Sequence, residues 1–152
     1  MIKIYTDGAA QGNPGPGGYG IIMKYNQHYR EISQGYRLTT NNRMELLAVI
    51  VSLEAIKKDG IRVRIYSDSE YVINAIKKGW LWGWEKTNFR KKANPDLWQR
   101  FLKVYDPMKV KFVWIKGHAG HPENERCDVL AVQSAEGPDK LIDHGYEASV
   151  GK

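Results

Sequence analysis

Apolar positions in the first forty residues fall into short runs, separated by polar or glycine-bearing links, that predict three β-strands. The runs cover residues 2–7, about 18–26 and about 30–38, and they are rich in β-branched and aromatic side chains. Short polar or glycine-bearing links join them, which favours an antiparallel meander.

A period of three to four residues then predicts the first helix, over TTNNRMELLAVIVSLEAIKK. Its apolar stripe consists of Met44, Leu47, Ala48, Val51 and Ala55. The rest of the chain predicts, in order, a strand over IRVRIYS, a helix over SDSEYVINAIKK, a helix through PDLWQRFLKVY, a strand over VKFVWIK and a last helix over PENERCDVLAVQSA. This order predicts an α/β domain with a mixed sheet over residues 1–135. We expect residues 136–152 to form an irregular tail that could be flexible.

Composition narrows the class of protein. A chain of 152 residues with 42% hydrophobic and 26% charged residues is typical of one globular domain. The longest apolar run, residues 46–51, is too short to span a membrane, and MIKIYTDG shows no secretory signal. The single cysteine excludes an internal disulfide and fits a reducing compartment. We therefore expect a cytoplasmic protein.

The stretch GPGGYG, residues 15–20, fits the glycine pattern of a dinucleotide-binding loop, but its surroundings do not. Such a loop has to open a helix whose N-terminus holds the pyrophosphate. Here IIMKY follows and predicts a strand, and the prolines and glycines of residues 13–18 block a helix. We predict a β–turn–β connection whose glycines leave room for a large ligand beside Asp7.

Four acids stand where an α/β sheet positions chemistry. Asp7 ends the first strand, Asp68 follows IRVRIYS, and Glu45 and Asp128 lie near the starts of two helices. Taken singly, Glu45 could complete a capping box, Asp68 could favour a helix N-terminus and Asp128 could be a surface acid. Taken together, they favour a shared site, because converging carboxylates repel one another unless oxygen-preferring divalent cations are bound. Two magnesium or manganese ions could activate water at a phosphodiester.

The loop KGHAGHPENERCD offers a zinc alternative, with His118, His121, Cys127 and Asp128 as ligands. A single cysteine rules out a thiolate-rich site, and the histidines lie in a loop. His118 is better suited to transfer a proton or to assist product release.

The charge pattern suggests a polyanionic partner. The net charge is +6, and the pI is near 9.3. The segment KKGWLWGWEKTNFRKK, residues 77–92, holds six basic residues against one acid, interleaved with aromatic rings that can stack on bases or sugars. The structural alternative is an amphipathic helix whose tryptophans are core, which suits Trp80 and Trp84 but not Trp82.

Four blocks of sequence together resemble ribonuclease H type 1 in its bacterial form: YTDGAAQGNPGPGGYG, TTNNRMELLA, YSDSEYV and KGHAGHPENERCD. The resemblance covers about residues 2–135. It implies a five-stranded mixed sheet in the order 3-2-1-4-5, flanked by helices. It also implies cleavage of the RNA strand of RNA–DNA hybrids with two Mg²⁺ ions, for which Mn²⁺ can substitute, leaving 5′-phosphate and 3′-hydroxyl ends, by a monomer that needs no membrane.

The resemblance also implies roles for individual residues. Asp7, Glu45, Asp68 and Asp128 would bind metal and catalyse, and His118 would assist protonation and product departure. Substrate contacts would come from Asn13, Asn41 and Asn42 in the minor groove, Thr40 at a DNA phosphate, and the basic protrusion with Trp80, Lys86, Arg90, Lys91 and Lys92. Sensing of 2′-hydroxyls by the asparagines would distinguish RNA from DNA.

Three departures from the family pattern affect the substrate contacts. Glu70 stands where many members carry glutamine, so a negative charge replaces an amide near the RNA strand. Trp82 enlarges the aromatic content of the protrusion. No hybrid-binding domain precedes Met1, so we expect less processive binding than in longer members.

Two rival functions remain open on the sequence alone. One is a binding module for hybrids that has lost turnover, against which the presence of all four acids and His118 argues. The other is a different metal-dependent nuclease of the same broad fold, such as an integrase or resolvase, against which the Thr-Thr-Asn-Asn block and the basic tryptophan segment argue.

Overall fold

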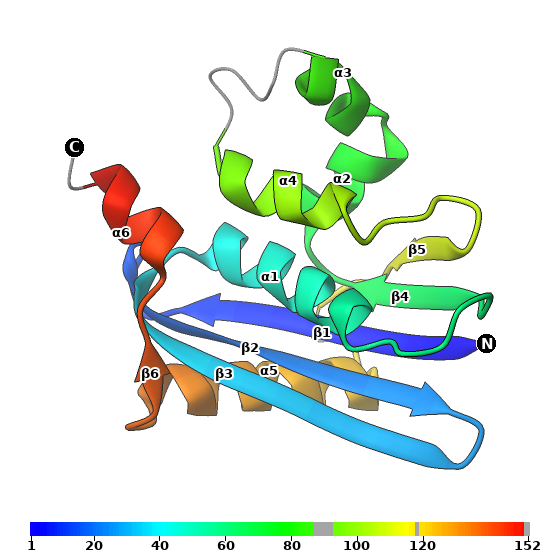
Figure 1. Ribbon diagram of the computed structural model, residues 1–152. Helices are drawn as coiled ribbons and strands as arrows, with labels where there is room; N and C mark the ends of the chain where they lie inside the picture. The colour runs from blue at the N-terminus through cyan, green and yellow to red at the C-terminus, as the bar shows by residue number, and fades with distance from the viewer. Residues whose placement is uncertain (87–92, 118, 151–152) are drawn as a thin grey trace.

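The computed structural model describes residues 1–86, 93–117 and 119–150 (Figure 1). Its centre is a six-stranded sheet in the order β5-β4-β1-β2-β3-β6. The strands are β1 (Ile2–Ala10), β2 (Gly15–Tyr25), β3 (His28–Thr39), β4 (Val63–Ser67), β5 (Val110–Trp114) and β6 (Lys140–Leu141). β1, β2 and β3 pair antiparallel, while β1–β4, β4–β5 and β3–β6 pair parallel. The expected mixed sheet and the order 3-2-1-4-5 are confirmed, and β6 is an additional edge strand.

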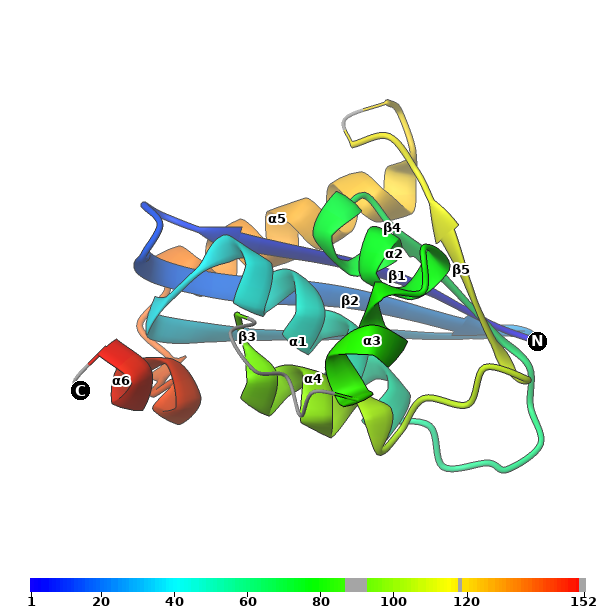
Figure 2. The same cartoon turned by 90° about the horizontal axis from the view of Figure 1, so that it is seen from above.

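Helices cover both faces of the sheet. They are α1 (Asn41–Glu54), α2 (Glu70–Lys77), α3 (Trp80–Lys86), α4 (Pro95–Leu102), α5 (Pro122–Glu136) and α6 (His144–Val150). Seen from above, α5 lies on one side of the sheet, and α1 to α4 lie on the other (Figure 2). None of the described helices is long and apolar enough to cross a membrane.

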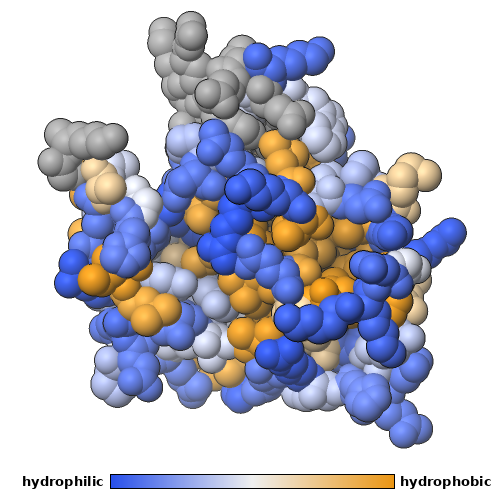
Figure 3. All heavy atoms as spheres, in the orientation of Figure 1, coloured by the Kyte–Doolittle hydropathy of each residue, from blue (hydrophilic) through white to orange (hydrophobic). Residues whose placement is uncertain are grey.

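The main core lies between the sheet and α1. Ile4, Ile21 and Ile65 are fully buried on the sheet, and α4 adds the fully buried Trp98 and Phe101. Residues 43–50 of α1 are all buried, so the helix is buried on almost every side. The single apolar stripe predicted from the sequence is therefore too narrow. A helix that is apolar on all sides is one enclosed by protein, which α4 and the sheet together achieve here. On the side of the molecule that faces the viewer in Figure 3, apolar residues reach the surface across the middle, between hydrophilic side chains.

The glycines of GPGGYG belong to β2 and make room for α5. A Cβ added to Gly18 would lie 2.7 Å from the carbonyl oxygen of Ala131, and one added to Gly20 would overlap the carbonyl oxygen of Cys127. Only glycine therefore allows the helix backbone to approach this strand so closely. The stretch forms no phosphate-binding loop, as predicted, but it belongs to β2 and not to the turn that was expected there.

The C-terminal segment corrects one expectation. Residues 136–152 were expected to be irregular, but the described part forms β6 beside β3 and then α6. The expectation failed because the contacts that order this segment are distant in sequence. Asp143, which is buried, binds Arg43 at the start of α1. A local pattern contains no trace of such a contact.

Candidate active site

Three of the four predicted acids meet at one place. Asp7 on β1, Glu45 on α1 and Asp68 directly after β4 each offer an oxygen, and these oxygens lie within 4.8 Å of one another. Strand pairing explains why Asp7 and Asp68 lie close together. Thr6 of β1 is paired with Ser67 of the parallel strand β4, and the two acids are the next residues on these strands.

Gly8 brings the third acid into place. A Cβ on this glycine would overlap the backbone of Met44 and Glu45 in α1. The absence of a side chain therefore lets α1 cross β1 in direct backbone contact, which places Glu45 beside Asp7. The backbone N–H of Gly8 also donates a hydrogen bond to Oδ1 of Asp7, at 3.0 Å.

Burial makes this cluster unfavourable when it is fully ionised. Asp7 is 5% exposed and Glu45 is 6% exposed. Burial, with smaller contributions from the charges of Asp68 and Asp128, raises the pKa of Asp7 to about 8. Burial and then the charge of Asp7 raise the pKa of Glu45 well above its ordinary value. Without a cation, the Asp7–Glu45 pair is therefore expected to hold a proton near neutral pH.

The N-caps of α1 and α2 are residues other than Glu45 and Asp68. Thr40 is the N-cap of α1, and its hydroxyl oxygen accepts a hydrogen bond from the backbone N–H of Arg43 at 3.3 Å. Ser69 is the N-cap of α2 and accepts from Val72. Neither Glu45 nor Asp68 is therefore needed as a cap.

The donor set fits a hard divalent cation. All three groups are carboxylates, and Oε2 of Glu45 is buried with no hydrogen-bond partner among the described residues. A buried acceptor without a partner is costly, and a cation would satisfy it. Carboxylate oxygens alone are the ligands that magnesium and manganese prefer.

The zinc alternative finds no support. Cys127 is buried, its thiol donates to the carbonyl oxygen of Tyr5 at 3.3 Å, and burial raises its pKa. His121 is exposed at the N-cap of α5. His118 lies outside the described residues, and the only metal-binding group found among those described is the carboxylate cluster.

Asp128 lies near the cluster but is not one of its three members. It is half-buried on α5, and its charge is among those that raise the pKa of Asp7. The described geometry therefore gives a core of three carboxylates with a fourth acid close enough to act on it.

Comparison with known proteins agrees with this geometry. The sequence profile of the RNase H family matches residues 1–136. The chain is 56% identical over 147 residues to ribonuclease H of Desulforamulus reducens, an alignment that covers 93% of this chain and 92% of the relative. It is 55% identical over 151 residues to ribonuclease H of Syntrophus aciditrophicus, covering 96% and 87%.

The chain belongs to the ribonuclease H family. It is a nuclease of the hydrolase class, as the resemblance implied. Solved structures of the ribonuclease H fold agree. LC9-RNase H1, a type 1 RNase H with the type 2 active-site motif, superposes with a TM-score of 0.79 at 31% identity, covering 99% of this chain and 81% of that one. LC11-RNase H1, solved in complex with an RNA/DNA hybrid, gives 0.65 at 28% identity, covering 90% and 97%.

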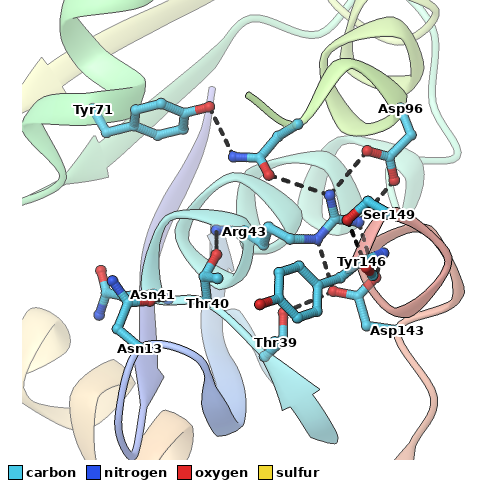
Figure 4. A network of polar contacts seen from close by, with 11 residues as sticks. Asn13, Thr39, Thr40, Asn41, Arg43, Tyr71, Asp96, Asp143, Tyr146 and Ser149 are labelled. Carbon is cyan, nitrogen blue, oxygen red and sulfur yellow. Dashed lines mark hydrogen bonds and ion pairs between the residues drawn. The ribbon is translucent and has the colours of Figure 1, made fainter. Parts of the chain in front are cut away.

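Several of the residues that a ribonuclease H is expected to use for substrate contact lie at or beside the N-terminus of α1. The backbone N–H of Asn41 donates to Oδ1 of Asn13 at 3.2 Å, and the Asn41 amide donates to the carbonyl oxygen of Gly8 at 3.4 Å. Thr40 lies beside them, as Figure 4 shows, and Asn42 is exposed. Gly8 follows Asp7, so this polar group adjoins the carboxylates.

The structure describes only some of the other residues that are predicted to contact the substrate. Glu70 is exposed at the first residue of α2, and Lys86 is exposed at the end of α3. Arg90, Lys91 and Lys92 lie outside the described residues, as does the side chain of Trp80.

Sequence reasoning missed an ion-pair network centred on the buried side chain of Arg43, two residues before Glu45. The Arg43 guanidinium binds Asp143 through Nε at 2.8 Å and Asp96 through Nη2 at 2.7 Å, and Nη1 donates to Asn94 at 3.3 Å (Figure 4). Asn94 in turn donates to the hydroxyl of Tyr71 on α2. The partners are up to 100 residues apart, so no local signal could have revealed them.

Proposed function

We propose that this chain cleaves the RNA strand of RNA–DNA hybrids endonucleolytically, leaving 5′-phosphate and 3′-hydroxyl ends. The observation that carries the proposal is the buried cluster of Asp7, Glu45 and Asp68 in a ribonuclease H family member. The binding of an RNA/DNA hybrid by LC11-RNase H1 supports the choice of substrate. All these acids come from one chain, so a monomer suffices.

Asp7, Glu45, Asp68 and Asp128 would hold two Mg²⁺ ions, or Mn²⁺ in their place. When bound, such a pair activates a water and stabilises the leaving oxygen of the phosphodiester. The protein holds the carboxylates rigidly, since Asp7 and Asp68 extend from paired strands and α1 rests on Gly8. His118 would pass a proton to the leaving group or assist product release.

Recognition of the hybrid would begin at the α1 N-terminus. Asn13, Asn41 and Asn42 would contact the minor groove, where only the RNA strand offers 2′-hydroxyls. Thr40 would contact a phosphate of the DNA strand. The basic protrusion would bind phosphates through Lys86, Arg90, Lys91 and Lys92, and Trp80 would supply an aromatic surface.

A cleavage assay with matched variants tests the proposal. Labelled RNA–DNA hybrid, double-stranded RNA and double-stranded DNA are incubated with magnesium, with or without chelator. Only the hybrid should be cut, only with metal present, and the product ends identify the bond broken.

Asp7→Asn and Asp68→Asn should each abolish cleavage while hybrid binding persists. Asp59→Asn, in an exposed loop, is the matched control and should cut normally. Turnover retained by either active-site variant would refute the assignment, and binding by a wild-type protein that never cuts would favour the binding-module alternative.

A further inference from the structure

Helix α5 leaves part of its face of the sheet uncovered. It packs on β1, β2 and β3, whereas α1 to α4 lie on the opposite face (Figure 2). Over the described residues, α5 therefore covers β4 and β5 far less than it covers the first three strands. Arg64 and Tyr66 of β4 are only half-buried, and Lys111 of β5 is exposed.

Four cations lie in register across this face. Lys3 of β1 is paired with Lys24 of β2 and with Arg64 of β4, and Arg64 is paired with Lys111 of β5. Residues opposite one another in adjacent strands point to the same face, so the four side chains form one line. With strands about 4.8 Å apart, the line is roughly 14 Å long. We call these four residues the cation row.

Most of the cation row lacks neutralising partners. Lys24 pairs with Glu123 at 2.6 Å. Over the residues that the structure describes, Lys3, Arg64 and Lys111 form no ion pair. Like charges directly opposite in a sheet are unfavourable, and here three such pairs follow one another. An external polyanion would relieve this repulsion.

A basic hollow adjoins the row at the N-terminal ends of β4 and β5. Its volume is about 300 Å³, and its lining contains no carboxylate. It is lined by Met1, Arg62, Val63, Arg64, Met108, Lys109 and Lys111. Val63 precedes Asp68 by five residues, so the hollow lies roughly 17 Å along the strand from the carboxylates.

We propose that the cation row and the basic hollow form a second nucleic-acid contact, which binds the phosphate backbone of a segment outside the carboxylate site. Duplex nucleic acid carries one charge per ~1.7 Å of its axis, so a line of this length meets several phosphates. Beside the row, the rings of Tyr5 and Tyr66 stack at 4.7 Å, and their half-buried side chains extend the flat surface. A nucleic acid fits better than an acidic peptide, because its phosphates recur at a regular spacing and the four cations lie in one line across the strands. The identity of the partner thus rests on the proposed nuclease function.

The test measures binding of labelled double-stranded DNA in chelator, because this ligand is not the substrate and needs no metal. The slope of log K against log salt is compared for wild type, Arg64→Gln/Lys111→Gln and the control Lys57→Gln/Lys103→Gln. The control removes the same charge from exposed positions outside the row. The slope for the row variant, Arg64→Gln/Lys111→Gln, should be less steep than that of wild type by about 1.8, at ~0.9 for each lost phosphate contact. The slope for the control should change much less.

Equal slopes for the two double variants would overturn the proposal. Binding of polyglutamate, an acidic peptide, is measured alongside. If the row variant loses this binding while its DNA slope stays that of wild type, the partner is an acidic peptide and the proposal is also overturned. If the double variant does not fold, Lys111→Gln alone, on the edge strand, should lower the slope by about 0.9. Cleavage of a short hybrid by the row variant should match wild type. Failure of the wild type to cut would contradict the proposed function, while the DNA-binding comparison would still decide the second contact.

Discussion

Arg43 and Asp143 form a buried bidentate ion pair: Nε lies 2.8 Å from Oδ2, and Nη2 lies 2.9 Å from Oδ1. The hydroxyl of Thr39 donates to the same carboxylate at 2.7 Å. The pair fastens the C-terminal segment to the start of the helix that carries Glu45. It therefore connects the stability of α6 with the geometry of the site.

Asp143→Asn should destabilise the protein by about 3 kcal/mol, because removal of one partner leaves a buried charge incompletely paired. Chemical denaturation measures the free energy of unfolding. The control Asp139→Asn, an exposed acid nearby, should change it by less than about 0.5 kcal/mol. Equal stability of the two variants would show that Asp96 alone satisfies Arg43.

Acid should weaken the same pair. Burial alone would raise the pKa of Asp143, but hydrogen bonds from Arg43 and Thr39 outweigh it and leave this pKa below its ordinary value. A carboxyl with a lowered folded pKa contributes stability that is complete above its unfolded pKa of about 3.9 and is lost as pH falls through the folded value. The wild type should therefore lose more stability between about pH 5 and pH 3 than Asp143→Asn does. Urea denaturation across this range measures the difference, and parallel curves would contradict it.

Magnesium should stabilise the protein more at high pH. The pKa of Asp7 is raised to about 8 in the folded chain. Its contribution to the stability of the metal-free protein is therefore complete below about pH 4 and is lost as pH rises through about 8. Magnesium has to displace the proton, so the rise in melting temperature that it causes should grow between about pH 6 and pH 8.

Asp7→Asn tests this linkage. It should stabilise the metal-free protein near neutral pH by about 1 to 3 kcal/mol and remove most of the effect of magnesium. Asp59→Asn, which is exposed, should behave like wild type in both respects. A magnesium effect that is the same at both pH values would exclude a protonated Asp7 in the metal-free site.

Glu70→Gln should improve substrate binding. Glu70 is exposed at the start of α2, two residues after Asp68, where its charge would face a phosphate backbone. Removal of a repulsion of about 1 kcal/mol should lower KM about fivefold and leave kcat nearly unchanged. Steady-state kinetics on a hybrid measure both, with Glu136→Gln at the end of α5 as control. An unchanged KM would place Glu70 away from the substrate.

The sequence by itself determined the kind and order of most elements, because hydrophobic periodicity and turn residues act over a few neighbours. It also marked Asp7, Glu45, Asp68 and Asp128 as candidates, since each ends a predicted strand or lies near the start of a predicted helix, although β1 in fact continues to Ala10. Only the tertiary structure decided that the first three converge within 4.8 Å. Their meeting depends on the β1–β4 register and on the close approach of α1 to Gly8.

The same distinction explains what sequence reasoning could not supply. The contact between Arg43 and Asp143 spans 100 residues, and the cation row joins residues from four strands. Such relationships depend on strand pairing and packing, which bring together side chains that are far apart in the chain. The residues next to each of these side chains in sequence do not indicate its distant partner.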